Sequence, residues 1–496
     1  MTGKIIPFAQ ELRPLLPTVV GNVDYKTLRQ QLDEIDALLR ESGLQEQFIG
    51  LSVENWFKEA TDREPTALEQ QKFQERSRRA LRCMVLRTLL QESFRVFTCN
   101  LAGNPLYQWF CCIDAIDVVR VPSKSELQRF SHWLPAEQMR KLMDQLLGKA
   151  AFQPQELRLC TPLDVEDYFL DSTALKADIH FPTDWVLLRD GVRTLMKATI
   201  LIRREGLKGR MRPPEEFLRQ MNRLCIQMSA EGRRCGSKKG RKRVLRQMKK
   251  LVKTIRCHAQ RHRKLLDTRW EQTQWTRPQA EQILKRIDNV IEQLPRAQKQ
   301  AHERIIGQRK VANGEKILSL YDPDINVIVR GKAGAEVEFG NTVLLGENKQ
   351  GVILDYAMYR DQAPADSHLL FESMLRVLDG TGIQVGAVAT DRGFASASNS
   401  RTLEEAGTYD ATCPRNPKEL GRRMKDKRFA DMQRRRAQTE GRIGILKANF
   451  LGRPLRARGF ESRELALAWG VLTHNLWALA RLRKSKKQSQ PSARAA

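Results

Sequence analysis

Two short apolar runs, far apart in the sequence, each lead directly to an aspartate. Residues 168–170 (YFL) precede Asp171, and residues 385–389 (VGAVA) precede Asp391 after a single threonine. Short apolar runs of this kind are typical of buried strands. Neighbouring strands in a sheet lie about 4.8 Å apart, so acids at their ends can lie close together. The two runs therefore predict one sheet that presents both aspartates, although a strand-end aspartate taken alone commonly caps a helix.

The sequence between and after these runs predicts a mixed sheet flanked by helices, an α/β core. Alternating residues and glycine punctuation over 326–359 indicate consecutive antiparallel strands. A helix is predicted over 365–380, closed by Gly380, and the strongly apolar stretch 464–482 predicts a helix that closes the core. The order is strand with aspartate, three strands, helix, strand with aspartate, and helix with glutamate. It matches the order of elements in the ribonuclease-H-like fold.

Residues 433–450 predict a helix with one functional face. At about 100° per residue, one side of this helix carries Gln433, Arg436, Glu440 and Lys447. A neighbouring apolar stripe would anchor the helix on the core. A single carboxylate among cationic side chains suits a site where a metal ion and a phosphodiester meet. Taken alone, the pattern also fits a solvated basic helix with one ion-paired glutamate.

Three carboxylates, Asp171, Asp391 and Glu440, are the candidate catalytic residues and metal ligands. Two carboxylates about 4 Å apart repel each other by about 4 kcal/mol at an effective dielectric of about 20, so a third needs a divalent cation to hold it. Oxygen ligands without histidine or cysteine favour Mg²⁺ or Mn²⁺ over zinc. Two such ions would activate the attacking oxygen and stabilise the leaving oxygen of an in-line phosphodiester displacement.

The charge of the chain indicates a polyanionic partner. Its 86 basic and 58 acidic residues leave a net charge of +28, for which nucleic acid is the default partner. Residues 203–270 hold 23 Lys and Arg against 5 Asp and Glu, and their apolar spacing predicts a basic amphipathic helix in a helical hairpin. The candidate DNA contacts there are Lys238, Lys239, Arg241, Lys242 and Arg243. A solvated charged hairpin without DNA contacts is the alternative.

Residues 1–155 predict an all-helical N-terminal domain that binds DNA. Within residues 121–134, Ser123 and Glu126 have the spacing of a capping box before a helix. Arg129 would project from the exposed side, and such a helix could enter a DNA groove in helix-turn-helix fashion. A capped helix with only a structural role explains the same residues.

The remaining boundaries follow from changes in composition. Residues 156–204 together with 316–482 form the predicted catalytic core, 205–315 a basic helical insertion between the two aspartates, and 483–496 a disordered basic tail. No signal peptide and no apolar run of membrane-spanning length are apparent, so we expect a cytoplasmic protein without a membrane partner. The nine cysteines show no paired spacing and are expected to be reduced thiols.

Three motifs give the chain a resemblance to a known family. LDST surrounds Asp171, VATDRGF surrounds Asp391, and RRRAQTEGRIGILKANFLGRPL surrounds Glu440. With these motifs the chain resembles the D-D-E transposases of bacterial insertion sequences, most closely the ISNCY kind, over most of residues 164–482. The resemblance implies a ribonuclease-H-like core that cleaves the terminal inverted repeats of its element and joins them to target DNA at the nucleoid. It also implies that the three acids bind the catalytic metals, and that a homodimer bridges two DNA ends.

The last catalytic helix carries most of the implied DNA contacts. A related branch of the family has Tyr-x2-Arg-x3-Glu-x6-Lys there, and its last three positions match Arg436, Glu440 and Lys447. Arg436 and Lys447 are therefore expected to contact DNA near the cleaved end, and Arg392 of the second motif is placed with them. Gln433 stands where the pattern has tyrosine, although glutamine can donate a hydrogen bond to the same phosphate oxygen.

The insertion departs from the family. Several related transposases carry theirs between the second aspartate and the glutamate, which are only 49 positions apart here, whereas the two aspartates are 220 positions apart. The role of the insertion therefore does not transfer from those relatives. Two other functions stay open: a related metal-dependent DNA nuclease, and a non-catalytic DNA-binding protein derived from a transposase.

Overall fold

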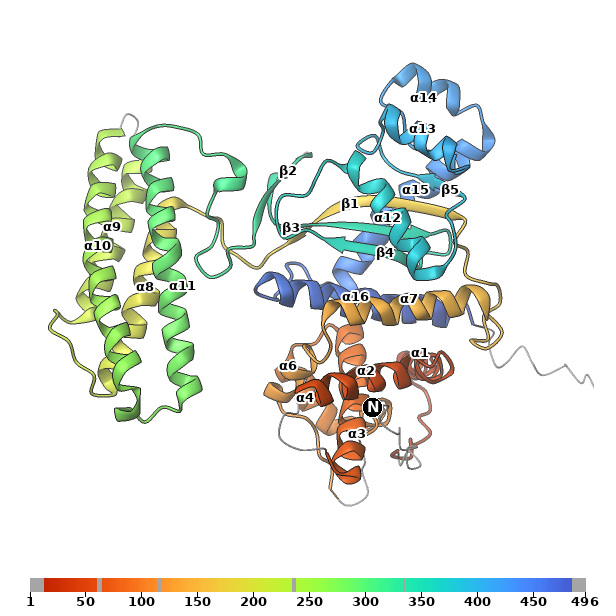
Figure 1. Cartoon of the computed structure of the whole chain (residues 1–496), viewed down its shortest axis with the longest axis horizontal. Coiled ribbons are helices and arrows are strands. Elements are labelled where there is room, and N and C mark those ends of the chain that lie inside the picture. Colours follow the sequence, from red (N-terminus) through yellow and green to blue (C-terminus); the bar gives the residue numbers. More distant parts are fainter. Residues whose placement is uncertain (1–12, 60–64, 114–117, 234–237, 333–334, 484–496) are drawn as a thin grey trace, which may run out of the picture. The chain divides into compact units, whose positions relative to one another are not determined.

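The computed structural model is a mostly helical protein with one mixed sheet (Figure 1). It describes residues 13–59, 65–113, 118–233, 238–332 and 335–483. The chain divides into two compact units. The first contains Met1–Leu175, Thr342–Tyr359 and Ala363–Ala496, and the second contains Lys176–Asn341 and Arg360–Gln362. Among these residues, none of the helices combines the length and the apolar composition that a membrane span requires.

The N-terminal region of the first unit is helical, as predicted. Its helices are α1 (Val23–Glu41), α2 (Leu44–Glu59), α3 (Ala67–Leu90), α4 (Phe94–Gly103), α5 (Pro105–Phe110), α6 (Lys124–Phe130) and α7 (Ala136–Phe152). Side-chain caps set several of the starts: Thr66 and Glu69, for instance, form a capping box at the beginning of α3. The buried side chains of this region belong to the same hydrophobic cluster as those of the sheet.

A mixed sheet follows the helical region. Its strands are β1 (Asp167–Lys176), β2 (Asn326–Lys332), β3 (Ala335–Asn348), β4 (Ile353–Met358), β5 (Ala387–Ala389) and β6 (Tyr409–Asp410). They form a six-stranded sheet in the order β2-β3-β1-β5-β6, with β4 paired to β3 beside that path. The strands β2, β3 and β4 are antiparallel neighbours, as predicted. In contrast, β5 runs parallel to both β1 and β6.

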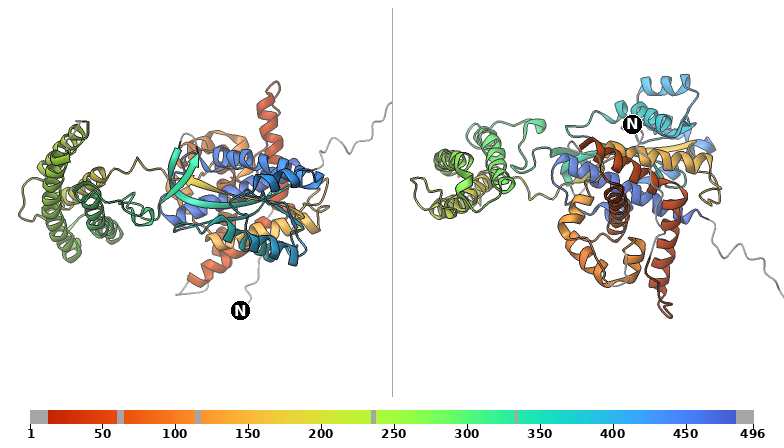
Figure 2. Two further views of the ribbon diagram at one scale, coloured as in Figure 1. Left: turned by 90° about the horizontal axis from the view of Figure 1, so that it is seen from above. Right: turned by 60° about the horizontal axis from the view of Figure 1, so that its bottom comes forward.

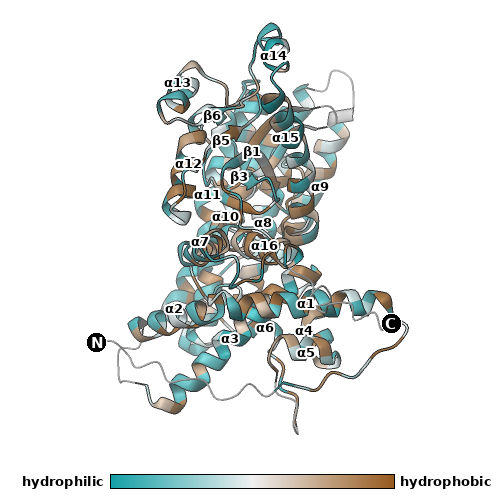
Figure 3. Ribbon diagram, turned by 90° about the vertical axis from the view of Figure 1, so that its right-hand side faces the viewer, coloured by the Kyte–Doolittle hydropathy of each residue, from teal (hydrophilic) through white to brown (hydrophobic). Residues whose placement is uncertain are grey.

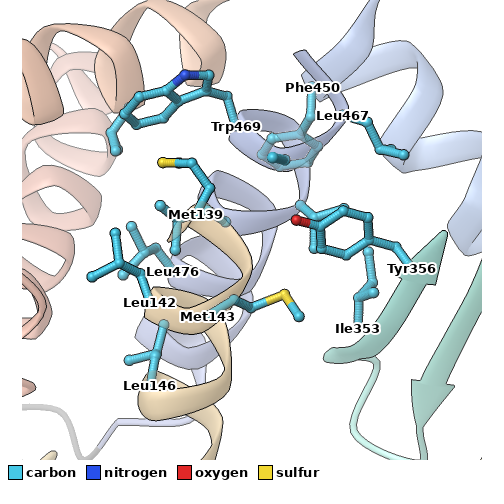
Figure 4. Packing of buried hydrophobic residues seen from close by; sticks show 14 of the residues in the cluster. Met139, Leu142, Met143, Leu146, Ile353, Tyr356, Phe450, Leu467, Trp469 and Leu476 are labelled. Carbon is cyan, nitrogen blue, oxygen red and sulfur yellow. The ribbon is translucent and has the colours of Figure 1, made fainter. Parts of the chain in front are cut away.

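Five further helices complete the first unit. They are α12 (Asp366–Thr381), α13 (Ala397–Glu405), α14 (Pro417–Arg423), α15 (Lys427–Leu446) and α16 (Phe460–Arg481). The apolar helix α16 closes the core, as predicted, and Figure 4 shows its Leu476 with Met139 and Leu142 of α7. In contrast, α14 buries no side chain and is hydrophilic in Figure 3.

The end of α12 differs from the prediction. The helix passes through Gly380 and ends at Thr381, and Gly382 adopts the left-handed conformation with φ of 71°. Glycine adopts this conformation without the steric cost of a Cβ atom. Gly380 instead allows a close approach, because a Cβ there would lie 2.7 Å from Cγ of Asp144.

The second unit contains four helices that pack side by side (Figures 1 and 2). They are α8 (Asp184–Arg204), α9 (Pro214–Arg233), α10 (Lys238–Arg269) and α11 (Arg277–Ala301). The basic helix α10 is amphipathic, as predicted, and buries Leu245, Val252 and Ile255. The predicted two-helix hairpin is therefore part of a larger cluster, because α8 and α9 also contribute apolar stripes to its core.

The predicted limits of the four parts of the chain stay predictions. Helix α8 lies before residue 205, in the part predicted as catalytic core. It nevertheless packs in one cluster with α9, α10 and α11, which belong to the predicted insertion. Of the predicted tail, only Arg483 lies within the described residues. It forms ion pairs with Glu34 and Glu41 of α1, both at 2.8 Å.

Candidate active site

Parallel pairing of β1 with β5 brings the two predicted aspartates to the same level of the sheet. Residues 167–169 pair with 387–389, so Asp171 and Asp391 each follow the last paired residue of their segment by two positions. Asp171 is only 8 % exposed. One detail of the prediction is wrong: β1 continues to Lys176 because the sheet also buries Thr173, Ala174 and Leu175, so Asp171 lies within the strand and not at its end.

The turn after β5 fixes the carboxylate of Asp391. The backbone N–H of Gly393 donates a hydrogen bond to its Oδ1 at 2.9 Å. A Cβ atom at Gly393 would lie 2.7 Å from Oδ2 of Asp366 and 3.0 Å from Oδ1 of Asp391. Only glycine therefore leaves room for both carboxylates beside this turn.

Helix α15 is fastened to the sheet by side chains on a different face from Glu440. Arg435 donates to the carboxylate of Glu347 on β3 at 2.9 Å, and its guanidinium lies 4.6 Å from the ring centre of Phe169 on β1. The hydroxyl of Thr439 donates to the same carboxylate at 2.8 Å. These contacts leave Glu440 exposed on the helix surface.

The electrostatics of Asp171 connect it to the other predicted residues. Burial, together with the negative charges of Asp391 and Glu440, raises the pKa of Asp171 to about 6, and the Arg436 guanidinium opposes that rise. Charges influence one another in this way only over short distances. The structure therefore brings Asp171, Asp391, Glu440 and Arg436 into one neighbourhood.

Two basic residues of the predicted DNA-binding face lie close to β1. Arg436 has a buried Nε atom without a hydrogen-bond partner in the described part of the chain. Lys447 begins η4 (Lys447–Leu451), a short π-helical segment after α15. Its Nζ donates to Oγ1 of Thr173 at 2.5 Å and to the carbonyl oxygen of Ala174 at 2.7 Å. Lys447 therefore binds the strand just beyond Asp171.

The remaining two predicted contacts near the site differ in exposure. The side-chain amide of Gln433 donates to the carbonyl oxygens of Thr390 at 3.3 Å and Ala411 at 2.5 Å. Gln433 thus ties α15 to the ends of β5 and β6, so its N–H groups are directed at the protein. Arg392 is exposed in the turn that follows Asp391.

Asp366, at the start of α12, is a fourth acid near the site, and sequence reasoning missed it. Its carboxylate accepts a hydrogen bond from Ser172, the residue after Asp171, while burial and the charge of Asp391 raise its pKa. The only sequence signal was an acid in the first turn of a predicted helix. Such acids are common because they complement the helix dipole, so the signal does not identify a site.

The donors of this site suit a hard divalent cation. All of them are carboxylate oxygens, which Mg²⁺ and Mn²⁺ prefer. A cation would offset the repulsion that raises the pKa of Asp171. Even so, within the described residues no group of three His, Cys, Asp or Glu side chains is close enough to hold a metal ion. Metal binding would therefore require at least one of these acids to move closer to the others.

These observations were compared with known proteins. No family model, curated protein or solved structure matches the chain. The architecture is therefore established only as a mostly helical α/β protein with a six-stranded mixed sheet and a preceding helical region. Any function has to be argued from the residues themselves.

The five predicted DNA contacts of the insertion lie at the start of α10, in the second unit. Lys238, Lys239 and Arg243 are exposed, whereas Arg241 and Lys242 are partly buried. The guanidinium of Arg241 lies 5.4 Å from the ring centre of Trp185, so this residue also packs against α8. Their DNA contacts stay predictions.

Arg129 is exposed on α6, which is shorter than predicted, with seven residues. The hydroxyl of Ser123 accepts a hydrogen bond from the backbone N–H of Glu126 at 3.2 Å, as predicted for a cap. The carboxylate of Glu126 instead pairs with Arg76 of α3 at 2.9 Å. The helix is thus anchored on α3, and the role of Arg129 stays a prediction.

Proposed function

We propose that this protein is a DNA transposase of the D-D-E kind, which uses divalent metal ions to cleave the ends of its element and transfer them to target DNA. The observation that carries the proposal is the buried Asp171, whose carboxyl group is influenced by Asp391 and Glu440. A buried acid with two acidic neighbours is unfavourable without a cation. Carboxyl groups perturbed in this way cluster at functional sites.

The order of strands supports a ribonuclease-H-like core. The first acid lies on β1, the strands β3 and β4 form an antiparallel pair, and β5, parallel to β1, leads to the second acid. The helix α15 then carries the glutamate. This is the order of elements that the sequence predicts for that fold.

The residues of the site have separate tasks in this proposal. Asp171, Asp391 and Glu440 would hold the ions, which when bound activate the attacking oxygen and stabilise the leaving oxygen. Arg436, whose Nε has no partner in the described chain, would donate a hydrogen bond to a non-bridging phosphate oxygen. Lys447 and Gln433 position α15 against β1 and against the ends of β5 and β6.

A second candidate is a DNA-binding protein without catalysis. It is favoured by one observation, namely that the described residues contain no group of three ligands ready to hold a metal ion. The net charge of +28 would attract DNA in either case, and two copies would be expected to bridge two DNA ends only in a transposase. A related nuclease would share the acids and would differ in leaving the cleaved ends unjoined.

Incubation of the full chain with DNA that carries the ends of its element, a target plasmid and Mg²⁺ separates these candidates. Joined products support the transposase, cleavage without joining supports the nuclease, and binding alone supports the non-catalytic protein. Asp391→Asn should lose the joined products. Asp379→Asn, which changes an exposed acid on α12, is the matched control and should retain them. Equal activity of both variants would contradict the proposal.

A further inference from the structure

A cavity of about 360 Å³ lies beside α15 within the first unit. The turn between β3 and β4 contributes Gln350 and Gly351, α15 contributes Arg442, and α16 contributes His474, Trp477 and Arg481. Cavities of this size hold small organic ligands, usually with a few polar groups that fix their orientation. The composition of the lining therefore decides which ligand class fits.

The cavity is distinct from the candidate active site. Glu440 and Arg442 are two residues apart on α15, which places them about 200° apart around the helix axis. Glu440 lies on the same face of α15 as Arg436, whereas Arg442 lines the cavity. A ligand in the cavity would therefore contact the face of α15 opposite to the one that carries Glu440.

Arg442 is a cation without a bonded anion. Among the described residues, Arg442 forms no hydrogen bond and no ion pair within 4 Å. Burial lowers the pKa of Arg442, and the positive charges of Arg435 and Arg481 lower it further. The negative charge of Glu347 opposes this shift. The acid that influences Arg442, Glu347, already accepts hydrogen bonds from Arg435 and Thr439. A partly buried guanidinium without a bonded anion favours an anion from outside the chain.

The shape of the cavity is fixed around this guanidinium. Gly351 has a φ of +83°, and any side chain there would overlap the Arg442 guanidinium. Gln350 is held by hydrogen bonds, since its amide nitrogen donates to Oγ1 of Thr161 at 3.2 Å and to the carbonyl oxygen of Pro162 at 3.0 Å. The walls next to Arg442 are therefore ordered before any ligand arrives.

The other side of the cavity is aromatic. The guanidinium of Arg481 lies over the ring of Trp477, 4.7 Å from its centre. Burial lowers the pKa of His474 to about 4, so this side chain is neutral at physiological pH. Stacked arginine and tryptophan side chains suit a planar, electron-rich ring, and nucleobases stack on such groups without requiring one sequence.

We propose that this cavity binds a nucleotide, with its phosphate on Arg442 and its base against Trp477 and Arg481. The nucleotide is either free or an unpaired residue of a DNA strand, since both present the same phosphate and base. The binding does not depend on the proposed transposase activity. It uses the opposite face of α15 and needs no metal ligand.

Titration of the full chain with thymidine monophosphate, inorganic phosphate and a five-residue oligothymidine tests the site. Salt of about 0.3 M weakens non-specific attraction to the basic surface. Arg442→Gln should raise the Kd for thymidine monophosphate or for the oligonucleotide at least about tenfold, as expected for loss of charged hydrogen bonds. Trp477→Leu should weaken the binding of both thymidine monophosphate and the oligothymidine, and it should leave the binding of inorganic phosphate unchanged.

Two controls keep the result interpretable. Arg401→Gln removes one exposed arginine from α13 and should leave every Kd unchanged. Asp391→Asn should also bind the nucleotide normally, so a failed transposition assay and a failed cavity are distinguishable. A response confined to the oligonucleotide assigns the site to a DNA strand, and a response to the monophosphate assigns it to free nucleotides. Equal affinities of wild type and a folded Arg442→Gln variant for both nucleotide probes would overturn the proposal.

Discussion

The two compact units differ in how their charged side chains are exposed to solvent. In the first, Asp171 is 8 % exposed, and its pKa is shifted because burial and neighbouring acids act on it at short range. In the second, α10 buries Val244 and Leu245 and keeps Lys238 and Arg243 exposed. Exposed charges are screened over about 8 Å at physiological salt, so they add to a field without forming one coupled group. If the proposed function is right, the chemistry belongs to the first unit, and the basic start of α10 adds to DNA affinity from the second.

The largest effect is expected at the three predicted acids. Asp171→Asn, Asp391→Asn and Glu440→Gln should each lower the rate of DNA cutting by about a thousandfold or more, which corresponds to about 4 kcal/mol of activation free energy. Affinity for DNA should change less than about twofold, because these side chains do not attract phosphates. Cleavage of labelled DNA and its binding are measured on the same preparations. An equal loss of cutting and binding would remove the distinction between the two units.

Neutralising the basic residues at the start of α10 should instead lower DNA affinity and leave the chemical step of cutting intact. Replacement of Lys238, Lys239, Arg241, Lys242 and Arg243 by glutamine should lower DNA affinity at least about tenfold at physiological salt. The slope of log affinity against log salt should fall by about 0.9 for each phosphate that the variant no longer neutralises. The measurement is a DNA titration at several salt concentrations.

The matched control for α10 is Arg263→Gln. Arg263 lies on the same helix but is already paired with Asp267 at 2.7 Å and Asp288 at 3.0 Å. Its removal should leave the salt slope unchanged. An unchanged slope in the five-residue variant as well would reduce the insertion to a structural role.

The stability of the metal-free protein should depend on Asp171 in a defined pH window. Its pKa is about 6 in the folded chain against an ordinary value of 3.8, so the folded state disfavours its ionised form. The cost is absent below about pH 4, grows as the pH rises toward 6, and is fully present above that. Asp171→Asn should therefore stabilise the metal-free chain at pH 7 by at most about 3 kcal/mol.

Thermal unfolding with a chelator at pH 4 and pH 7 checks this expectation. The variant should gain stability over the wild type only at the higher pH, and added Mn²⁺ should reduce the gain by binding the wild-type carboxylate. A variant that is less stable than the wild type at pH 7 would show that Asp171 already has a favourable partner.

The smallest effect is expected at Asp366. This residue touches the site through Ser172 and lies beside Asp391 at Gly393, so it acts on a ligand and is not one of the three predicted acids. Asp366→Asn should weaken Mn²⁺ binding by less than about tenfold while leaving DNA affinity unchanged. Isothermal titration with Mn²⁺ measures the change. A loss as large as that of Asp391→Asn would make Asp366 a fourth ligand.

Local patterns predicted much of the fold. The apolar spacing of α10 and α16 and the alternation over 326–359 each gave the correct element, because burial of one face is a local property of the sequence. The apolar run before each acid predicted that both runs belong to one sheet, and β1 does pair with β5. Arg435 and Thr439, which fasten α15 to Glu347, depend on residues about ninety positions away and carry no local signal.

Three features of the site lay beyond sequence reasoning for related reasons. Asp366 comes near Asp391 only through the turn at Gly393. Gln433 bonds to the backbone carbonyl oxygens of the residues that directly follow β5 and β6, which no side-chain pattern encodes. The extension of β1 past Asp171 depends on its neighbours in the sheet, since an acid in mid-strand needs a buried polar environment to be tolerated.

The central claim is that Asp171, Asp391 and Glu440 bind divalent metal together, and titration calorimetry of the full chain with Mn²⁺ tests it most directly. Binding should weaken below about pH 6, as protons compete for Asp171, and the affinity should fall at least about tenfold in each of the three single variants. Glu419→Gln, an exposed acid on α14, should bind like the wild type. Wild-type affinity in Glu440→Gln would contradict the claim, because the helix would then contribute no ligand.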